Sequence, residues 1–191
     1  MGLRPISLRD RVPWRAARAR NAEWLRPWDA TSPAGRADQP PTFGHMVRAL
    51  LREARAGRAM PFVMTVRGEL VGQLTVGGIT WGSLRSAHIG YWVDQAVAGR
   101  GITPTSVALA SDHLFAIGLH RVEINIRPEN TASLRVVEKL GFRDEGLRPR
   151  LLHIDGDWRD HRSFALTRDE VGDGLVARYR RYLRDTPPRP T

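Results

Sequence analysis

Apolar positions recur along the chain with two different periods, which predicts a mixture of helices and strands. Up to residue 57 the period is that of a helix. We expect one helix over residues 9–28, which are rich in Arg and Ala, and a loop of Pro, Gly and polar residues over 29–41. A second helix is expected from an N-cap at Thr42 to Gly57, with an apolar face formed by Val47, Leu50, Leu51 and Ala54.

From residue 61 onward the period changes to that of strands. Turns that contain glycine separate three expected strands, at 62–66, 70–76 and 87–93. After Gly99-Arg100-Gly101 a helix is expected in which Pro104 falls in the first turn, the one place where a helix accepts proline. Its apolar face is Val107, Ala110, Leu114 and Ile117.

The remainder of the chain continues to alternate between strand and helix patterns. The elements expected there are a strand at 122–127, a helix from an Asn130 cap to Gly141, strands at 150–154 and 161–166, and a charged C-terminal helix. We therefore expect a single domain over residues 1–184, followed by a disordered, Pro-rich tail over 185–191.

The unit from residue 87 to 127 is a strand, a Gly-rich turn, a helix and a strand. Such a crossover makes the two strands parallel neighbours. Glycines in the turn allow a close approach to a ligand, and the helix N-terminus offers free N–H groups to an anion. Pro104 stands where a dinucleotide fingerprint has its third glycine, and no P-loop Gly-Lys-Ser/Thr is present. The turn is thus a phosphate site of another kind, or only a tight turn.

Composition narrows the function classes. The absence of cysteine excludes disulfides, a thiolate nucleophile and a cysteine zinc site, and no histidine spacing is typical of a metal site, so no metal is expected. No apolar run approaches the roughly 18 residues of a membrane span, and the Arg-rich start lacks the apolar segment of a secretory signal. A cytoplasmic protein without membrane contact is expected.

The formal net charge is +10, yet Lys139 is the only lysine. This excess of arginine is explained either by a compositional bias or by a basic surface that speeds encounters with acidic partners. Aromatic residues are not interleaved with a basic strand face, so specific DNA binding is not expected.

Several short motifs together resemble those of the GNAT acetyltransferases, and within them the RimJ/RimL group of ribosomal-protein N-terminal acetyltransferases. The resemblance extends over about residues 3–167. The matching motifs are Trp24-Leu25-Arg26-Pro27-Trp28, Ile89-Gly90-Tyr91-Trp92-Val93, Gly99-Arg100-Gly101-Ile102, Asn130-x-x-Ser133, Glu138-Lys139-Leu140-Gly141-Phe142 and the segment 148–166.

The resemblance implies a fold and a reaction. The implied fold is the α/β (α+β type) GNAT fold, a mixed, mostly antiparallel twisted sheet with one splayed parallel pair and flanking helices. The implied reaction is direct acetyl transfer from acetyl-CoA to a protein N-terminal α-amine, for example of a ribosomal protein. Two alternatives stay open: an acetyltransferase of a small amine such as a polyamine or an aminoglycoside, and a non-catalytic CoA- or nucleic-acid-binding module. Monomer and dimer also stay open.

The resemblance further implies which residues bind acetyl-CoA. Backbone groups of Tyr91, Trp92 and Val93 would pair with the pantetheine arm and polarise the thioester carbonyl. Amides of the loop would hold the pyrophosphate, Asn130 would fix the start of the next helix, and Ser133 would lie near the sulfur. The loop residues are Val97, Ala98, Gly99, Arg100, Gly101 and Ile102.

Two positions depart from the family pattern. Ala96 stands where the pyrophosphate loop often begins with Gln or Arg, but a loop that binds through backbone N–H groups tolerates the change. Val137 stands where many relatives have a tyrosine that protonates the leaving thiolate. Ser133 is the expected substitute, with a purely local role at the helix start as the alternative reading.

A base is needed because only a neutral amine attacks. His88 and Glu123 are the two candidates: His88 shares a strand face with Trp92, and Glu123 lies on the polar face of the strand 122–127. A surface histidine and an ion-paired glutamate are the alternative readings, and proton loss to water is a third. Trp24 and Trp28 are candidates to line the acceptor pocket, or else packing residues.

Overall fold

The computed structural model describes residues 1–35 and 42–186. The end of the expected 29–41 loop and the expected tail beyond 186 lie outside the described residues. Helix α6 (Leu175–Asp185) ends one residue past the predicted domain boundary. The extent of the domain stays a prediction.

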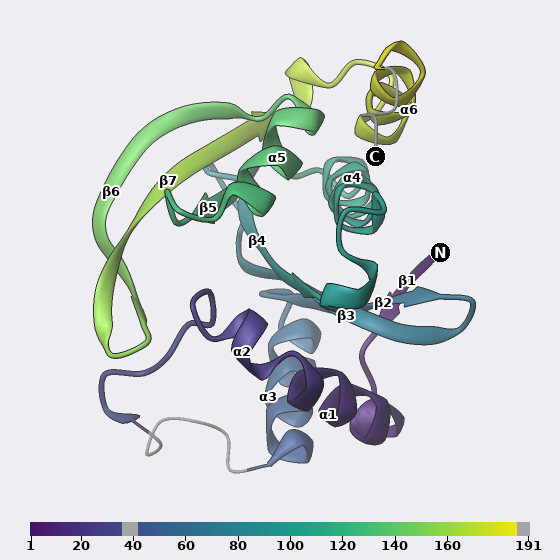
Figure 1. Cartoon of the computed structure of the whole chain (residues 1–191). Helices are drawn as coiled ribbons and strands as arrows, with labels where there is room; N and C mark the ends of the chain where they lie inside the picture. The colour runs from purple at the N-terminus through teal and green to yellow at the C-terminus, as the bar shows by residue number, and fades with distance from the viewer. Residues whose placement is uncertain (36–41, 187–191) are drawn as a thin grey trace.

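A single sheet of seven strands runs through the molecule in the order β1-β2-β3-β4-β5-β7-β6 (Figure 1). β4 and β5 are parallel, and every other neighbouring pair is antiparallel. This confirms the predicted mixed sheet with one parallel pair. The strands are β1 (Gly2–Pro5), β2 (Met60–Val66), β3 (Glu69–Thr80), β4 (Ser86–Val93), β5 (Arg121–Ile126), β6 (Arg143–Ile154) and β7 (Asp157–Thr167).

Helices lie on both sides of the sheet (Figure 1). α4 (Ile102–Ala116), α5 (Thr131–Leu140) and α6 pack together over one face, while α1 (Arg11–Arg20), α2 (Ala22–Leu25) and α3 (Phe43–Arg55) lie on the other. Short 3-10 turns follow β1, β4 and β7: η1 (Leu8–Asp10), η3 (Gln95–Val97) and η4 (Arg168–Glu170).

Two hydrophobic cores correspond to these two layers. The larger core joins the sheet to α4, α5 and α6, and the smaller one joins β2 and β3 to α1 and α3. α4 departs from the predicted single apolar face because it lies between the sheet and α6. Ser106 and Ser111 are therefore fully buried, whereas the predicted core residue Ile117 is 38% exposed.

Local signals placed most helix ends correctly. Thr42 caps α3 by accepting a hydrogen bond from the His45 amide, and Gly141 ends α5 in the left-handed region. The single helix predicted over 9–28 is wrong. It breaks at Asn21, whose side-chain amide donates to the Ala17 carbonyl while its oxygen accepts from the Gln95 amide.

The remaining differences concern strands. β1 was not predicted, because its four residues, Gly2–Pro5, show no alternation and are held by pairing with β2. β6 and β7 are longer than predicted and form one curved hairpin. No helix among the described residues is long and apolar enough to cross a membrane.

Candidate active site

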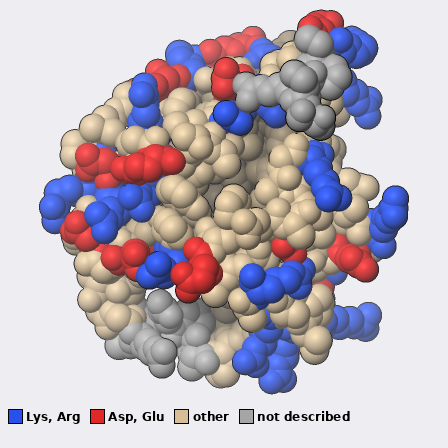
Figure 2. Space-filling model, in the orientation of Figure 1, with Lys and Arg blue, Asp and Glu red and all other residues tan. Residues whose placement is uncertain are grey.

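The parallel strands β4 and β5 part soon after they meet. Their pairing consists of Ser86 with Arg121, Ala87 with Val122 and His88 with Glu123. β3 continues to pair with β4 as far as Val93, so only the β5 side of β4 is released. Figure 2 shows a hollow lined mainly by uncharged atoms at the centre of this view, where the two strands diverge in Figure 1. Backbone groups along the open side of β4 are thus available to a ligand.

The loop after β4 ends at the start of α4 with glycines in the left-handed region. Gly99 has φ 80° and Gly101 has φ 77°, values that other residues adopt only with strain. Gly101 is the N-cap of α4, and no side chain caps the helix. The free amides and the positive end of this 15-residue helix therefore suit a phosphate group.

Helix α1 holds the beginning of this loop in place. Asp94 accepts hydrogen bonds from Arg20 Nε (2.7 Å) and from the Ala96 amide (3.1 Å). Burial acts to raise the pKa of Asp94, but the hydrogen bonds from Arg20 and Ala96 outweigh it, so that its pKa is lowered. The Asn21 oxygen adds a hydrogen bond from the Gln95 amide at 2.9 Å. The loop is positioned by residues some 74 positions earlier in the chain.

Tyr91 and Ser133 face each other on the α5 side of the opening. Asn130 accepts from the Ser133 amide at 3.0 Å, so the expected cap of α5 is present. Burial raises the pKa of Tyr91 to about 12, opposed by the nearby Ser133 hydroxyl. No hydrogen bond of good geometry reaches the buried Tyr91 hydroxyl from any described residue. Val137 lies in the core, 1% exposed.

His88 lies on the other face of β4, where two glycines make room for it. A Cβ on Gly77 would lie 2.8 Å from His88 Nε2, and one on Gly78 would lie 2.8 Å from its ring as well. Because any side chain at either position would displace the imidazole, the Gly77-Gly78 pair fixes His88 against β3. The sequence contains this signal, but its meaning depends on the strand register that sets Gly77 opposite His88.

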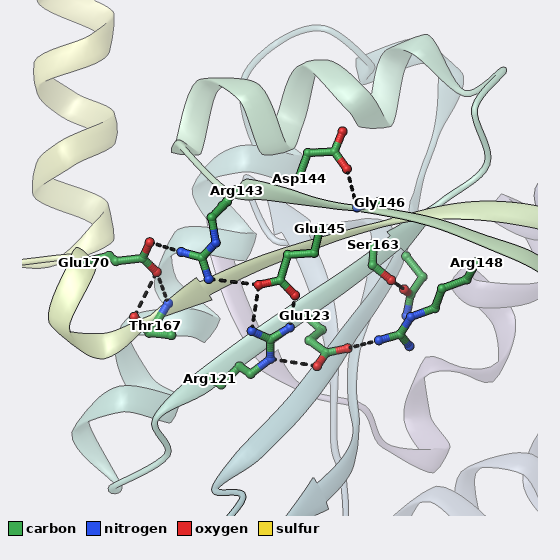
Figure 3. Close-up of polar contacts among 11 residues, drawn as sticks. Arg121, Glu123, Arg143, Asp144, Glu145, Gly146, Arg148, Ser163, Thr167 and Glu170 are labelled. Carbon is green, nitrogen blue, oxygen red and sulfur yellow. Dashed lines mark hydrogen bonds and ion pairs between the residues drawn. The ribbon is translucent and has the colours of Figure 1, made fainter.

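Glu123, the register partner of His88, belongs to a network of ion pairs (Figure 3). Arg121 Nε donates to Glu123 at 2.8 Å, and Arg148 approaches it at 3.4 Å. Arg121 also pairs with Glu145, and this interaction lowers the pKa of Glu145 to about 2. The oxygens of Glu123 are therefore engaged by two guanidinium groups.

The side chain of Trp92 points toward α1 rather than into the strand opening. The Arg18 guanidinium lies 5.4 Å from the Trp92 ring centroid and 5.7 Å from that of Trp14. Arg18 also forms a two-bond ion pair with Asp29. Trp92 thus joins β4 to the helical layer, and its carbonyl oxygen lies against Gly72 of β3.

The segment after α2 is attached to the end of β5. Arg127 donates to the Pro27 carbonyl at 2.7 Å, and its guanidinium lies 5.5 Å from the Trp28 ring centroid. Trp28 thereby lies beside the strand opening, and Trp24 is half-buried on α2. Arg127 was not predicted, because its partners lie 100 residues away in the sequence.

A cleft of about 460 Å³ opens between α1, α2 and the tip of the β6–β7 hairpin. It includes Arg18, which contacts Trp92, so it lies on the same face of the sheet as His88. Its charged residues are Arg18, Arg26, Glu23, Asp29 and Asp155. Three carboxylates against two guanidiniums give one net negative charge. Among residues 1–35 and 42–186 no cluster of His, Asp or Glu could hold a metal ion.

Comparison with known proteins agrees with this geometry. The sequence profile of the acetyltransferase (GNAT) domain matches residues 1–143. The structure resembles that of Mycobacterium smegmatis RimJ in complex with CoA-disulfide, with a TM-score of 0.88 and 40% sequence identity over 96% of this chain and 89% of that one.

Two curated relatives align at lower coverage or identity. The [ribosomal protein uS5]-alanine N-acetyltransferase of Escherichia coli (strain K12) is 28% identical over 83% of this chain and 84% of its own length. A Bacillus subtilis (strain 168) protein described as "Probable N-acetyltransferase YjcK" is 40% identical over 98 residues. That alignment spans 51% of this chain and 54%, about half, of the relative.

Proposed function

The chain belongs to the GNAT acetyltransferase family, and on that premise we propose that it transfers the acetyl group of acetyl-CoA to the α-amine at a protein N-terminus. The observation that carries the proposal is the opening between β4 and β5, which ends at the uncapped start of α4. An elongated thioester with a diphosphate fits this combination, since backbone groups line one part and helix amides the other.

The donor would be held mainly by the backbone. The open edge of β4 over Tyr91, Trp92 and Val93 would bind the pantetheine arm. The amides from Gly99 to Ile102 would bind the diphosphate, since those of Val97 and Ala98 already donate to the Asp94 and Gln95 carbonyls. Glycines at 99 and 101 leave the approach free of side chains. RimJ of M. smegmatis, which this chain resembles, has been solved with CoA-disulfide.

Transfer requires one new bond and one broken bond. The neutral amine attacks the thioester carbonyl carbon, a C–N bond forms, and the C–S bond breaks with its electron pair left on sulfur. The attacking nitrogen loses a proton on the acceptor side, and the sulfur is stabilised on the α5 side. The two sides are separated by the sheet, so both substrates would be bound at once.

The acceptor side suits an α-amine more than a polycation. A polyamine or aminoglycoside needs a surplus of carboxylates, whereas the cleft beside Arg18 has one net negative charge and two internal ion pairs. The E. coli relative is named as an alanine N-acetyltransferase of ribosomal protein uS5. We propose a protein N-terminus, ribosomal in kind, with Trp24 and Trp28 beside it.

We predict that the protein acetylates the α-amine of short peptides with small first residues and leaves internal lysines largely unmodified. An α-amine titrates near ~8 and a lysine near ~10.4, so far more of the α-amine is neutral at pH 7. Mass spectrometry of modified peptides is the measurement, with an N-terminally blocked peptide as control. Acetylation mainly of lysine side chains, spermidine or an aminoglycoside would contradict the assignment.

The proton of the attacking amine would be taken by His88, directly or through a water. His88 is exposed on the acceptor face and fixed by Gly77 and Gly78, whereas Glu123 is engaged by Arg121 and Arg148. A carboxylate held by two guanidiniums would have to give up one of them to accept a proton.

We predict that His88→Ala lowers kcat/KM by roughly 10²-fold, the low end for a general base. Glu123→Gln should lower it by less than about 5-fold, and His113→Ala, an exposed histidine on α4, should leave it unchanged. The rates are compared at a pH below the pKa of the acceptor amine. A larger loss with Glu123→Gln would transfer the role to Glu123, and changes under threefold in both would assign the proton to solvent.

The leaving sulfur would be stabilised by Ser133, with Tyr91 behind it. The buried Tyr91 hydroxyl keeps its proton because burial raises its pKa, and the Ser133 hydroxyl is the polar group that acts on it. Tyr91 would donate to Ser133 Oγ and direct the serine O–H toward the sulfur. The two hydroxyls would take over the role of the tyrosine that many relatives have at the position of Val137.

We predict that Ser133→Ala and Tyr91→Phe each lower kcat by about 10-fold, the value of one hydrogen bond to a charged group. The double variant should be no slower than either single variant, since both remove the same donor. Ser111→Ala, which removes another buried unpaired hydroxyl, is the matched control. Multiplied effects of the two substitutions, or an unchanged kcat, would refute the relay.

A further inference from the structure

The C-terminal helix α6 lies outside the segment that matches the family domain, residues 1–143, yet it packs against α4. Asp112 of α4 accepts hydrogen bonds from the first two amides of α6, those of Leu175 (2.6 Å) and Val176 (3.0 Å). Gly174 precedes them with φ 113°, and a Cβ there would lie 3.2 Å from the Asp112 carboxylate. These contacts set how far α6 extends along α4.

Arg178 fixes the rotation of the same helix. Its guanidinium donates to the Leu140 carbonyl at the end of α5 (3.4 Å) and to the Glu170 carbonyl before α6. Gly141 leaves space for it, because a Cβ at that position would lie 3.2 Å from Arg178 Nη1. With its start and its rotation both fixed, α6 presents the next residue, Tyr179, in one defined direction.

Tyr179 points at the N-cap of α4. Its side chain is buried, with the residue 3% exposed, and its ring stacks on Tyr182 at 6.2 Å. A Cβ on Gly101 would lie 3.2 Å from the Tyr179 hydroxyl, so that hydroxyl reaches the glycine that begins the helix. No hydrogen bond joins it to any other residue within 1–35 and 42–186.

The side chain is buried, but its hydroxyl oxygen still reaches solvent and has no partner among the described residues, so it is free to donate to a ligand at the start of α4. The nearest available groups are the first amides of α4, which are themselves free because no side chain caps the helix. The hydroxyl oxygen could accept from one of these amides, but no such bond forms among the described residues, whereas an anion between them would accept from the hydroxyl and the amides at once. Burial, followed by the charge of Tyr182, raises the pKa of Tyr179, which keeps the hydroxyl a donor.

We propose that Tyr179 is a ligand of the CoA diphosphate and that α6 is a structural part of the donor site. This inference rests on the proposed function, which supplies CoA as the ligand. The Tyr179 O–H donates to a phosphate oxygen, and the amides of Ile102 and Thr103 donate to the same phosphate group next to Gly101. Donors that lack the diphosphate gain nothing from α6, so this helix makes the enzyme selective for CoA over shorter pantetheine thioesters.

The test compares Tyr179→Phe with Tyr182→Phe, a matched loss of the hydroxyl from the stacked neighbour. CoA binding is measured by titration calorimetry, and kcat/KM is measured with acetyl-CoA and with S-acetylpantetheine. We expect Tyr179→Phe to weaken CoA binding about 10-fold, as loss of a hydrogen bond to a charged group does. Its kcat/KM with S-acetylpantetheine should stay within twofold of wild type, and Tyr182→Phe should match wild type throughout.

The outcomes separate this inference from the proposed function. If wild type binds CoA and Tyr179→Phe binds it as tightly, Tyr179 is not a ligand. If Tyr179→Phe is impaired equally with both donors, or Tyr182→Phe weakens CoA binding as much, the effect belongs to the packing of α6 and the inference is overturned. If wild type itself binds no CoA, the donor assignment fails first.

Discussion

The parting of β4 from β5 after His88 is the constraint on which the rest of the structure depends. Backbone N–H and C=O groups inside a protein need partners, and strand pairing normally supplies them. Here pairing stops after three residue pairs while β3 continues along the other edge of β4 to Val93. A polar strand edge is thereby exposed at the middle of a sheet, next to the unpaired amides of α4. The surrounding contacts serve to keep this opening in place.

Different parts of the chain hold the two sides of the opening. On the donor side, Arg20 and Asn21 fix the loop through Asp94 and Gln95, and α6 packs against α4 with Tyr179 beside Gly101. On the acceptor side, Arg18 lies between Trp14 and Trp92. The sheet separates the donor side from the acceptor side, and the two sides connect only through the opening between β4 and β5. This division suits a reaction in which two substrates meet without a covalent enzyme intermediate.

Local sequence predicted the fold better than the site. The caps at Thr42 and Asn130, the glycine at 141 and the alternation of β5 are properties of a few adjacent residues, and the structure confirms them. The break at Asn21 depends on the Gln95 amide, the role of Arg127 depends on Pro27, and the position of His88 depends on Gly77 and Gly78. Such contacts follow from register and packing, so no local pattern could reveal them. The same holds for Tyr179, which meets Gly101 only because Asp112 and Arg178 fix α6.

Amide hydrogen exchange with and without acetyl-CoA tests most directly whether this opening is the donor site. Bound acetyl-CoA should slow exchange along residues 91–93, at the open edge of β4, and along residues 99–103, where no side chain caps α4, and leave the β6–β7 hairpin tip unchanged. Protection confined to these two segments is the result that the account predicts. Unchanged exchange there at millimolar acetyl-CoA, or protection elsewhere, would contradict it.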